Sequence, residues 1–510
     1  MQIQTVFRRI ILDLATSAMQ IFGRVLPFFG WILLGFSFIF LIPLAVGWAL
    51  NEPVLQVFTI GYLVIACVGV SILAWTQNLR RGLPDLRPRD GMLLVTLCWS
   101  VLPAFSAIPL YLYFEQAGRP ITFAFAYFEA TSGITTTGST VLTGLDNLPF
   151  AINLWRCGLQ WVGGMGILVL AVAILPLVNA GAGKLFRAES TGPLKESKLT
   201  PRIQETAKGL WLVYSGLSLL CLVSFWLGGM SWGDAWLHMF STMSLGGLSS
   251  YDASFAAFES PLLEWICVLF MMLASGSFAL YFAAIIRGSM AVVLRDHEWR
   301  ATMILLTGAS LLVSLILLFR GVVSDPFDAL RLGFFNLVSI ASTTGFATTD
   351  FSQWPVFIPV FMLMLSGVAT SAGSTGAGIK MARLLILLGQ TQREIFRLLH
   401  PRAIHPLVIG GGAVRNDVVF SMLAFLLVYG ATVLVMTFLL LLFDRSLDTA
   451  FSAVVASINN TGPGLGEIGP AGNYSIFSTP ELYLLSLAMI LGRLEILAFI
   501  AIFTREFWRQ

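Results

Sequence analysis

The sequence predicts an all-α polytopic membrane protein, built from four helix–loop–helix repeats and an N-terminal two-helix hairpin. Two observations predict this class. First, 57% of the 510 residues are hydrophobic and only 11% are charged, whereas a soluble domain has about 25% charged residues. Second, a polar, glycine-containing segment recurs four times between apolar runs. No long hydrophilic stretch remains for a soluble domain with a nucleotide site of its own.

Ten apolar runs provide the expected membrane-spanning helices, because about 20 apolar residues suffice to cross a bilayer. The first is too long for the core of a signal peptide, so we expect a retained helix. The runs are Pro27–Leu50, Val54–Thr76, Met92–Phe114, Ala151–Val178, Leu210–Leu227, Leu262–Ile286, Met303–Phe319, Val356–Val368, Val418–Phe443 and Leu482–Phe503.

Basic residues gather in alternate loops, which the positive-inside rule places in the cytoplasm. Both chain ends are basic as well, so we expect them on the same side, whereas the loop Glu115–Pro120 becomes external. The five cysteines and four histidines show no metal-binding spacing. The basic loops contain Arg80, Arg81, Arg87 and Arg89; Lys184 to Lys208; Arg287, Arg295 and Arg300; and Lys380, Arg383, Arg393, Arg397 and Arg402.

The four polar segments align on one glycine each. They read TSGITTTGST (131–140), STMSLGGLSSYD (241–252), ASTTGFATTD (341–350) and ASINNTGPGLGE (456–467). Every copy has an aromatic residue eleven positions before that glycine and a small residue six positions before it. The last three copies also carry an acidic residue five positions after it. The aligned glycines are Gly138, Gly247, Gly345 and Gly462.

A short apolar segment precedes each glycine, for example Phe123–Ser132 or Leu447–Ser457, and is too short to span a membrane. Each repeat therefore consists of a spanning helix, a half-helix, a re-entrant loop and a second spanning helix. The whole chain has ten spans and four re-entrant loops around a pseudo-fourfold pore. The expected units are the hairpin (1–90) and four repeats (91–200, 201–299, 300–403 and 404–510).

The loops suit a monovalent cation. Irregular backbone at membrane depth is tolerated where it is buried or lines a water-filled path, half-helix C-termini carry partial negative charge, and rings of carbonyls replace an ion's hydration shell. Small-residue packing motifs are the alternative, but these recur every fourth residue. We expect the filter at Thr136, Thr137, Gly138, Leu245, Gly246, Gly247, Thr343, Thr344, Gly345, Asn460, Thr461 and Gly462, with Asp252, Asp350 and Glu467 at its outer mouth.

Two further features lie in the apolar runs. The stretch Gly367–Lys380 (GVATSAGSTGAGIK) should interrupt a spanning helix, since glycine disfavours helix. It forms either a packing kink or a gating loop across the pore, with Gly367, Gly373, Ser374, Thr375, Gly376, Gly378 and Lys380 as gate residues. Arg493 lies deep in the last run, where charge is costly. It forms either a positive barrier below the filter or a structural ion pair, for instance with Glu129, whereas Arg156 is expected to be a snorkelling or interface residue.

These motifs resemble the Trk/Ktr/HKT superfamily of potassium transporters over roughly residues 25 to 510. The N-terminal hairpin and LQWVGGMGI (159–167) resemble its TrkH/TrkG-like branch, and Leu245 departs from the commoner threonine. The resemblance implies potassium rather than sodium, because the potassium-selective members keep all four glycines. It also implies a gating loop at Gly367–Lys380 and a pore-facing arginine at Arg493.

The resemblance further implies potassium uptake across a bacterial inner membrane, by a homodimer that binds a TrkA-like, nucleotide-binding cytosolic ring. Potassium is then the transported ion, with no organic cofactor and no nucleic acid involved. A secondary symporter with broken helices is the alternative function, but inverted repeats would favour it, whereas these repeats share one orientation. An enzyme is disfavoured because the apolar runs contain no His/Asp/Glu cluster.

Overall fold

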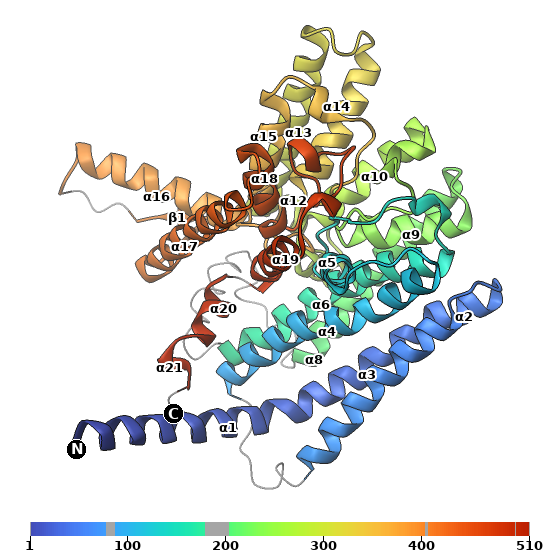
Figure 1. Cartoon of the computed structure of the whole chain (residues 1–510). Coiled ribbons are helices and arrows are strands. Elements are labelled where there is room, and N and C mark those ends of the chain that lie inside the picture. Colours follow the sequence, from blue (N-terminus) through green and yellow to red (C-terminus); the bar gives the residue numbers. More distant parts are fainter. Residues whose placement is uncertain (1, 78–86, 179–202, 403–405, 495, 509–510) are drawn as a thin grey trace.

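The computed structural model describes residues 2–77, 87–178, 203–402, 406–494 and 496–508, and these ranges are almost wholly helical (Figure 1). An N-terminal hairpin comes first: α1 (Gln2–Ser37) continues through the 3-10 turn η1 (Phe38–Phe40) into α2 (Leu41–Ala49), and α3 (Leu55–Thr76) returns alongside. Glycine permits this close approach, because a Cβ on Gly69 would lie 3.2 Å from the Gly30 carbonyl oxygen.

Four groups of helices follow the hairpin. The first is α4 (Pro88–Gln116), α5 (Phe123–Ile134) and α6 (Phe150–Val178). The second is α8 (Ile203–Leu227), α9 (Trp232–Met243), α10 (Pro261–Ala274) and α11 (Phe278–Arg287), followed by α12 (Ala291–Leu294). The third is α13 (His297–Phe319), α14 (Pro326–Ala341), α15 (Phe357–Ser366) and α16 (Met381–Leu399), with a small hairpin of β1 (Val408–Ile409) and β2 (Gly412–Ala413). The fourth is α17 (Asn416–Leu441), α18 (Leu447–Ile458), α19 (Thr479–Leu494) and α20 (Ile496–Ile502), followed by α21 (Arg505–Trp508).

Six helices of the described ranges are long and apolar enough to cross a membrane, or eight if two bent helix pairs each count as one span. The other two apolar runs fall on α6 and on α15, which has only 10 residues. The chain is therefore a multi-pass membrane protein, and the total of ten spans stays a prediction.

The run Leu262–Ile286 was predicted as one helix, and this prediction is wrong. The chain bends by 86° between α10 and α11, at Ser275–Ser277. The bend brings the Tyr281 hydroxyl to the Leu273 carbonyl at 2.8 Å, where a continuous helix would place a backbone donor. A side chain at the centre would displace this hydrogen bond, because a Cβ on Gly276 would lie 2.0 Å from that hydroxyl.

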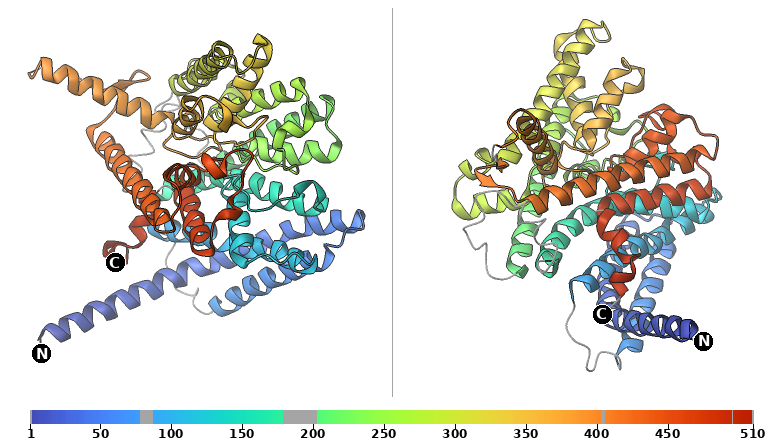
Figure 2. Two further views of the ribbon diagram at one scale, coloured as in Figure 1. Left: turned by 45° about the horizontal axis from the view of Figure 1, so that its top comes forward. Right: turned by 90° about the vertical axis from the view of Figure 1, so that its left-hand side faces the viewer.

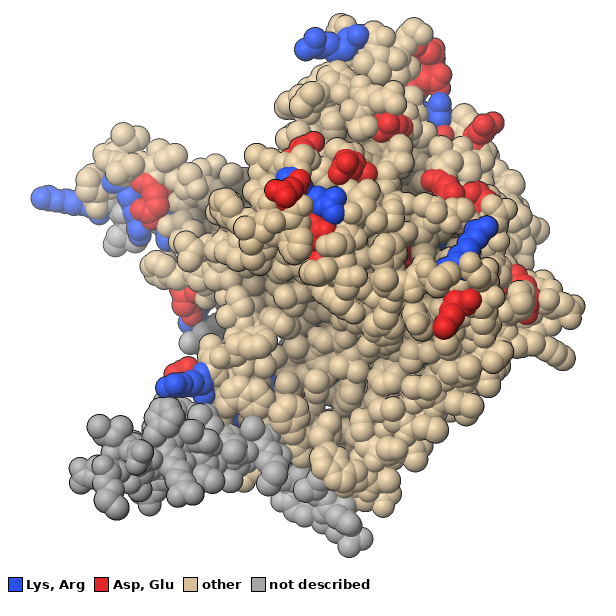
Figure 3. Space-filling view, in the orientation of Figure 1, with Lys and Arg blue, Asp and Glu red and all other residues tan. Residues whose placement is uncertain are grey.

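The groups are arranged around a common centre, with the α1–α3 hairpin on one side (Figure 2). Apolar side chains form several clusters, the largest of which join neighbouring groups, and the loops after the four half-helices contain buried Ser, Thr and Asn residues. A wide part of the face in Figure 3 carries no charged side chain, as a lipid-facing surface requires. Polar atoms are therefore gathered at the centre, and apolar atoms face outward.

Candidate cation filter and gate

All four half-helices, α5, α9, α14 and α18, end in the same way. In each, a backbone N–H of the loop donates to the carbonyl five residues earlier, with 2.8 Å between nitrogen and oxygen. This bond closes the final turn as in a Schellman motif. The small residues that the alignment places six positions before each glycine supply these carbonyls. The pairs are Thr137 to Ser132, Gly246 to Ser241, Thr344 to Ser339 and Thr461 to Ala456.

The residue two positions before each aligned glycine is left-handed, although none is glycine. The φ angles are 58° at Thr136, 54° at Leu245, 66° at Thr343 and 53° at Asn460. Such a conformation costs about 1 to 3 kcal/mol and persists only where the surroundings impose it. Because Leu245 takes this position, the second loop is in register on Gly247, as the alignment assumes, and Gly246 occupies the place of Thr137, Thr344 and Thr461.

The four glycines lie in a closed ring. A Cβ on Gly138 would lie 2.1 Å from the carbonyl oxygen of Gly246, and one on Gly247 would lie 1.9 Å from that of Thr344. A Cβ on Gly345 would lie 2.3 Å from the carbonyl oxygen of Thr461, and one on Gly462 would lie 2.9 Å from that of Thr137. Each loop thus presses its glycine against a carbonyl of the next, and the fourth loop returns to the first.

A cavity opens on this ring and is lined by all four glycines. Asp252 lines it too, and its carboxylate accepts the backbone N–H groups of Gly144 at 2.8 Å and Leu145 at 3.1 Å. Asp350 and Glu467, predicted at the same mouth, do not contribute to the lining. Asp350 instead caps the 3-10 turn η5 (Phe351–Gln353), and its hydrogen bonds from Ser352 hold the pKa of that carboxyl below its usual value.

Pairs of hydroxyl groups support the first and third loops from behind. Thr135 and Thr137 are joined by a hydrogen bond of 2.7 Å, and the equivalent Ser342 and Thr344 are joined at the same distance. The Asn460 amide donates to the Thr137 hydroxyl at 2.8 Å and so ties the fourth loop to the first. The second loop has no equivalent pair, because Gly246 has no side chain.

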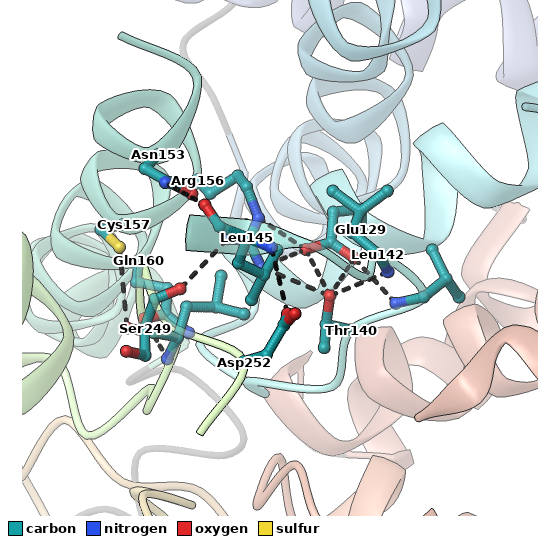
Figure 4. Close-up of polar contacts among 12 residues, drawn as sticks. Glu129, Thr140, Leu142, Leu145, Asn153, Arg156, Cys157, Gln160, Ser249 and Asp252 are labelled. Carbon is teal, nitrogen blue, oxygen red and sulfur yellow. Dashed lines mark hydrogen bonds and ion pairs between the residues drawn. The ribbon is translucent and has the colours of Figure 1, made fainter. Parts of the chain in front are cut away.

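A buried ion pair stands beside the first loop (Figure 4). Glu129 of α5 and Arg156 of α6 are in contact at 2.8 Å, and both side chains are fully buried. Glu129 also accepts from the Thr140 hydroxyl and the Val141 N–H, and Arg156 reaches the Ser249 carbonyl of the second loop at 3.2 Å. The expectation that Arg156 snorkels is therefore wrong, as is the pairing of Glu129 with Arg493. Both residues lie in apolar surroundings 27 positions apart, so only the fold reveals their pairing.

Neutralising Glu129 should destabilise the protein strongly. Glu129→Gln preserves the shape but leaves the Arg156 charge buried without its counter-ion, which costs about 3 to 5 kcal/mol. The measurement is the midpoint of thermal unfolding in detergent. The control is Asp328→Asn, which breaks a half-exposed pair with Arg331 and should cost less than about 1 kcal/mol. Equal shifts in the two variants would contradict the importance of the buried pair.

The stretch between α15 and α16 is not helical and crosses to other groups. The Thr375 hydroxyl donates to the Met243 carbonyl at the end of α9, at 3.1 Å. A Cβ on Gly376 would lie 3.3 Å from the Thr343 hydroxyl of the third glycine loop, so the stretch lies directly against that loop. Gly373 and Gly378 have positive φ, of 80° and 84°, and Lys380, at 71°, precedes α16. Ser374 is buried, and Gly367 accepts the N–H of Ile379 at 2.6 Å.

The α10–α11 break, which sequence reasoning missed, contacts this stretch. The Ser371 N–H donates to the Ser275 carbonyl at 2.9 Å, and the Phe278 N–H donates to the Gly373 carbonyl at 3.1 Å. Two interrupted helices thereby satisfy each other's backbone, as membrane burial requires. The only signal in the sequence was one glycine between two serines inside an apolar run.

Arg493 joins the same assembly. Its guanidinium donates to the Thr375 carbonyl at 2.8 Å and to the Gly163 carbonyl of α6 at 3.3 Å, and it lies 5.6 Å from the centre of the Trp99 ring. The side chain is buried. Arg493 therefore binds the interrupted stretch through a backbone carbonyl and forms no ion pair with Glu129.

This chain is similar to known proteins over nearly its whole length. A family model described as "Cation transport protein" (TrkH) matches residues 54–509. The Trk system potassium uptake protein TrkH of Vibrio parahaemolyticus is 40% identical over 96% of this chain and 100% of its own length. The corresponding TrkG protein of Escherichia coli is 36% identical over 97% of this chain and 100% of its own length.

A solved structure is similar as well. The crystal structure of the potassium transporter TrkH from Vibrio parahaemolyticus aligns with a TM-score of 0.87 and 37% identity, covering 96% of this chain and 100% of that one. The family model and the full-length relatives show the family, which agrees with the resemblance of the four glycine loops. The chain belongs to the TrkH family of cation transport proteins.

Proposed function

We propose that this chain is the potassium-translocating subunit of a Trk-type uptake system, with one pore through the ring of four glycine loops. The main support for this proposal is the ring, because four half-helix C-termini and their loop carbonyls converge on it. Their partial negative charge favours a cation there. The choice of potassium rests on the relatives, which are named potassium uptake proteins.

The carbonyl oxygens that replace the ion's water are those of the residues just before each glycine. We assign them to Thr136, Thr137, Leu245, Gly246, Thr343, Thr344, Asn460 and Thr461. Asp252 adds negative potential at the outer mouth, since it lines the cavity above the ring. Each of the four units between residues 91 and 510 contributes one loop, and the hairpin of residues 1–90 packs outside.

A gate lies below the filter in Gly367–Lys380. Its contact with Thr343 and its bond to Arg493 support a position across the ion path. The backbone bonds to Ser275 and Phe278 hold the stretch in this arrangement, and an open state requires them to break.

Ion flux into liposomes tests the function. The purified chain is reconstituted, and the fluxes of potassium, rubidium and sodium are compared at equal gradients. We expect flux of potassium and rubidium well above that of sodium, without any co-transported organic solute. Flux that requires an organic solute would favour the secondary symporter instead, and absence of any cation flux would overturn the proposal.

Removing the Arg493 charge should increase the rate of cation flux. Arg493→Ala is expected to raise cation flux per folded molecule about tenfold, which corresponds to a barrier lower by about 1.4 kcal/mol. Arg493→Lys retains the charge and should remain near the wild-type flux. If both variants conduct faster, then Arg493 acts as a tether for the Thr375 carbonyl rather than as a charge barrier. If neither does, Arg493 is structural.

The assembly is a homodimer in a bacterial inner membrane, with both termini cytoplasmic and a TrkA-like, nucleotide-binding ring as partner. Basic residues in alternate loops support this orientation. Helix α16 projects from the body (Figure 1) and exposes large apolar side chains, which suits a subunit contact. These are Leu388, Ile395, Phe396, Leu398 and Leu399.

A further inference from the structure

The second filter loop departs from the other three at one position. Gly246 stands where the other loops have Thr137, Thr344 and Thr461, so this loop has no hydroxyl next to its aligned glycine. The missing side chain leaves space behind the loop. A residue from α6 fills this space.

Gln160 of α6 bridges the loop across its aligned glycine. Its side-chain N–H donates to the Gly246 carbonyl at 2.6 Å, and its side-chain oxygen accepts the Leu248 N–H at 3.2 Å. The side chain is completely buried, and its place beside the loop is visible in Figure 4. Because one end must donate and the other must accept, only one orientation of the amide satisfies both partners.

The Gln160 amide occupies the volume that a threonine side chain would need. A Cβ on Gly246 would lie 2.5 Å from the Gln160 amide carbon. Gly246 and the Gln160 side chain therefore together occupy the space that a threonine fills in the other loops.

The bonded carbonyl is also part of the ring. The Gly246 oxygen is the atom that a Cβ on Gly138 would meet at 2.1 Å. Within the described ranges, no side chain donates to the equivalent carbonyls of Thr137, Thr344 or Thr461. Only in the second loop is this carbonyl oriented by a side chain, that of Gln160 from α6, among the described residues.

We propose that Gln160 is a selectivity-determining positioning residue: it holds the Gly246 carbonyl at the angle that the ion requires, in place of the hydroxyl support that the second loop lacks. This inference rests on the proposed potassium-conducting function. A buried carbonyl that loses its donor turns to find another partner, and the pore then coordinates potassium less well relative to sodium.

The test is a double-mutant cycle read as the potassium-over-sodium flux ratio in liposomes. Gln160→Ala should lower the ratio about tenfold, equivalent to about 1.4 kcal/mol. Gly246→Thr alone should lower it too, because its side chain collides with the Gln160 amide. The combination Gln160→Ala/Gly246→Thr should recover the ratio, because the threonine then takes the vacated space and restores the pattern of the other loops.

Two further variants separate positioning from packing. Gln160→Met keeps the volume without any hydrogen bond, so it should lower the ratio as Gln160→Ala does and also serves if that variant folds poorly. Cys157→Ala truncates a buried residue of α6 that approaches the same loop at Leu248, with 3.6 Å between its sulfur and that carbonyl oxygen. This control should leave the ratio unchanged.

A selective wild type with unchanged ratios in both Gln160 variants would overturn the inference and leave the proposed function standing. A double variant no better than the poorer single variant would also overturn it, since Gln160 would then be a packing residue only. A wild type that conducts no cation would overturn the proposed function and this inference with it.

Discussion

Replacing Gly345 with serine should lower the preference for potassium over sodium at least about tenfold, a change that requires only about 1.4 kcal/mol. The new Cβ would lie 2.3 Å from the Thr461 carbonyl oxygen and 2.9 Å from the Cδ atom of Pro463. Neither atom can yield without moving the fourth loop, so a carbonyl proposed to contact the ion must rotate. The measurement is the potassium-over-sodium flux ratio, normalised to folded protein.

Serine at the other three aligned glycines should lower the potassium-over-sodium ratio by different amounts. Gly138 and Gly247 approach backbone oxygens even more closely, at 2.1 and 1.9 Å, so they should behave like Gly345. Gly462 has its nearest oxygen at 2.9 Å and should tolerate serine better. Gly144 is a matched control, because it has φ +70° but no neighbour within 4 Å of an added Cβ. If Gly144→Ser lowers the ratio as much as Gly345→Ser, backbone strain rather than the ring explains the effect.

Deleting Ser371–Gly376 should open the pore. The flanking residues lie close together, since the Thr370 hydroxyl donates to the Ala377 carbonyl at 3.0 Å, so the gap that the shortened chain must close is small. The deletion removes the contacts with Met243, Ser275 and Arg493. Flux should rise about tenfold or more, as expected when a barrier of about 1.4 kcal/mol or more is removed, and it should become insensitive to the cytosolic partner.

Selectivity is the internal control for this deletion. The filter loops keep their own backbone bonds, so the potassium-over-sodium ratio should stay near wild type while total flux increases. Thr375→Val is a milder companion that removes only the hydroxyl bond to Met243, and it should raise flux less. A folded deletion variant that conducts no faster than wild type would identify the stretch as a packing kink.

The repeat could be predicted from the sequence because it depends on local backbone chemistry. A left-handed residue, a closing N–H and a glycine recur at fixed spacing, so four copies align even where Leu245 and Asn460 replace threonine. The interruption at Gly367–Lys380 was predictable for a related reason, since four glycines in one short stretch disfavour helix.

The failures concern contacts between distant segments. For Arg493, the suggested ion pair with Glu129 was wrong, because its guanidinium donates to backbone carbonyls, which leave no trace in the sequence. The Glu129–Arg156 pair joins two apolar segments in a way that neither segment reveals. Asp350 shares its spacing with Asp252, yet its carboxylate bonds locally to Ser352 and does not line the cavity on the ring, whereas Asp252 does. The α10–α11 break is bonded to the stretch between α15 and α16, and a hydropathy pattern does not reveal such bonds.

The central claim is that the ion passes through the ring of four glycine loops. An anomalous-difference map from crystals of the protein grown in rubidium, a potassium substitute, tests it most directly. The account predicts density on the axis of the ring, beside the carbonyl oxygens of Thr137, Gly246, Thr344 and Thr461. Density between helices elsewhere in the membrane region, with none at the ring, would contradict it.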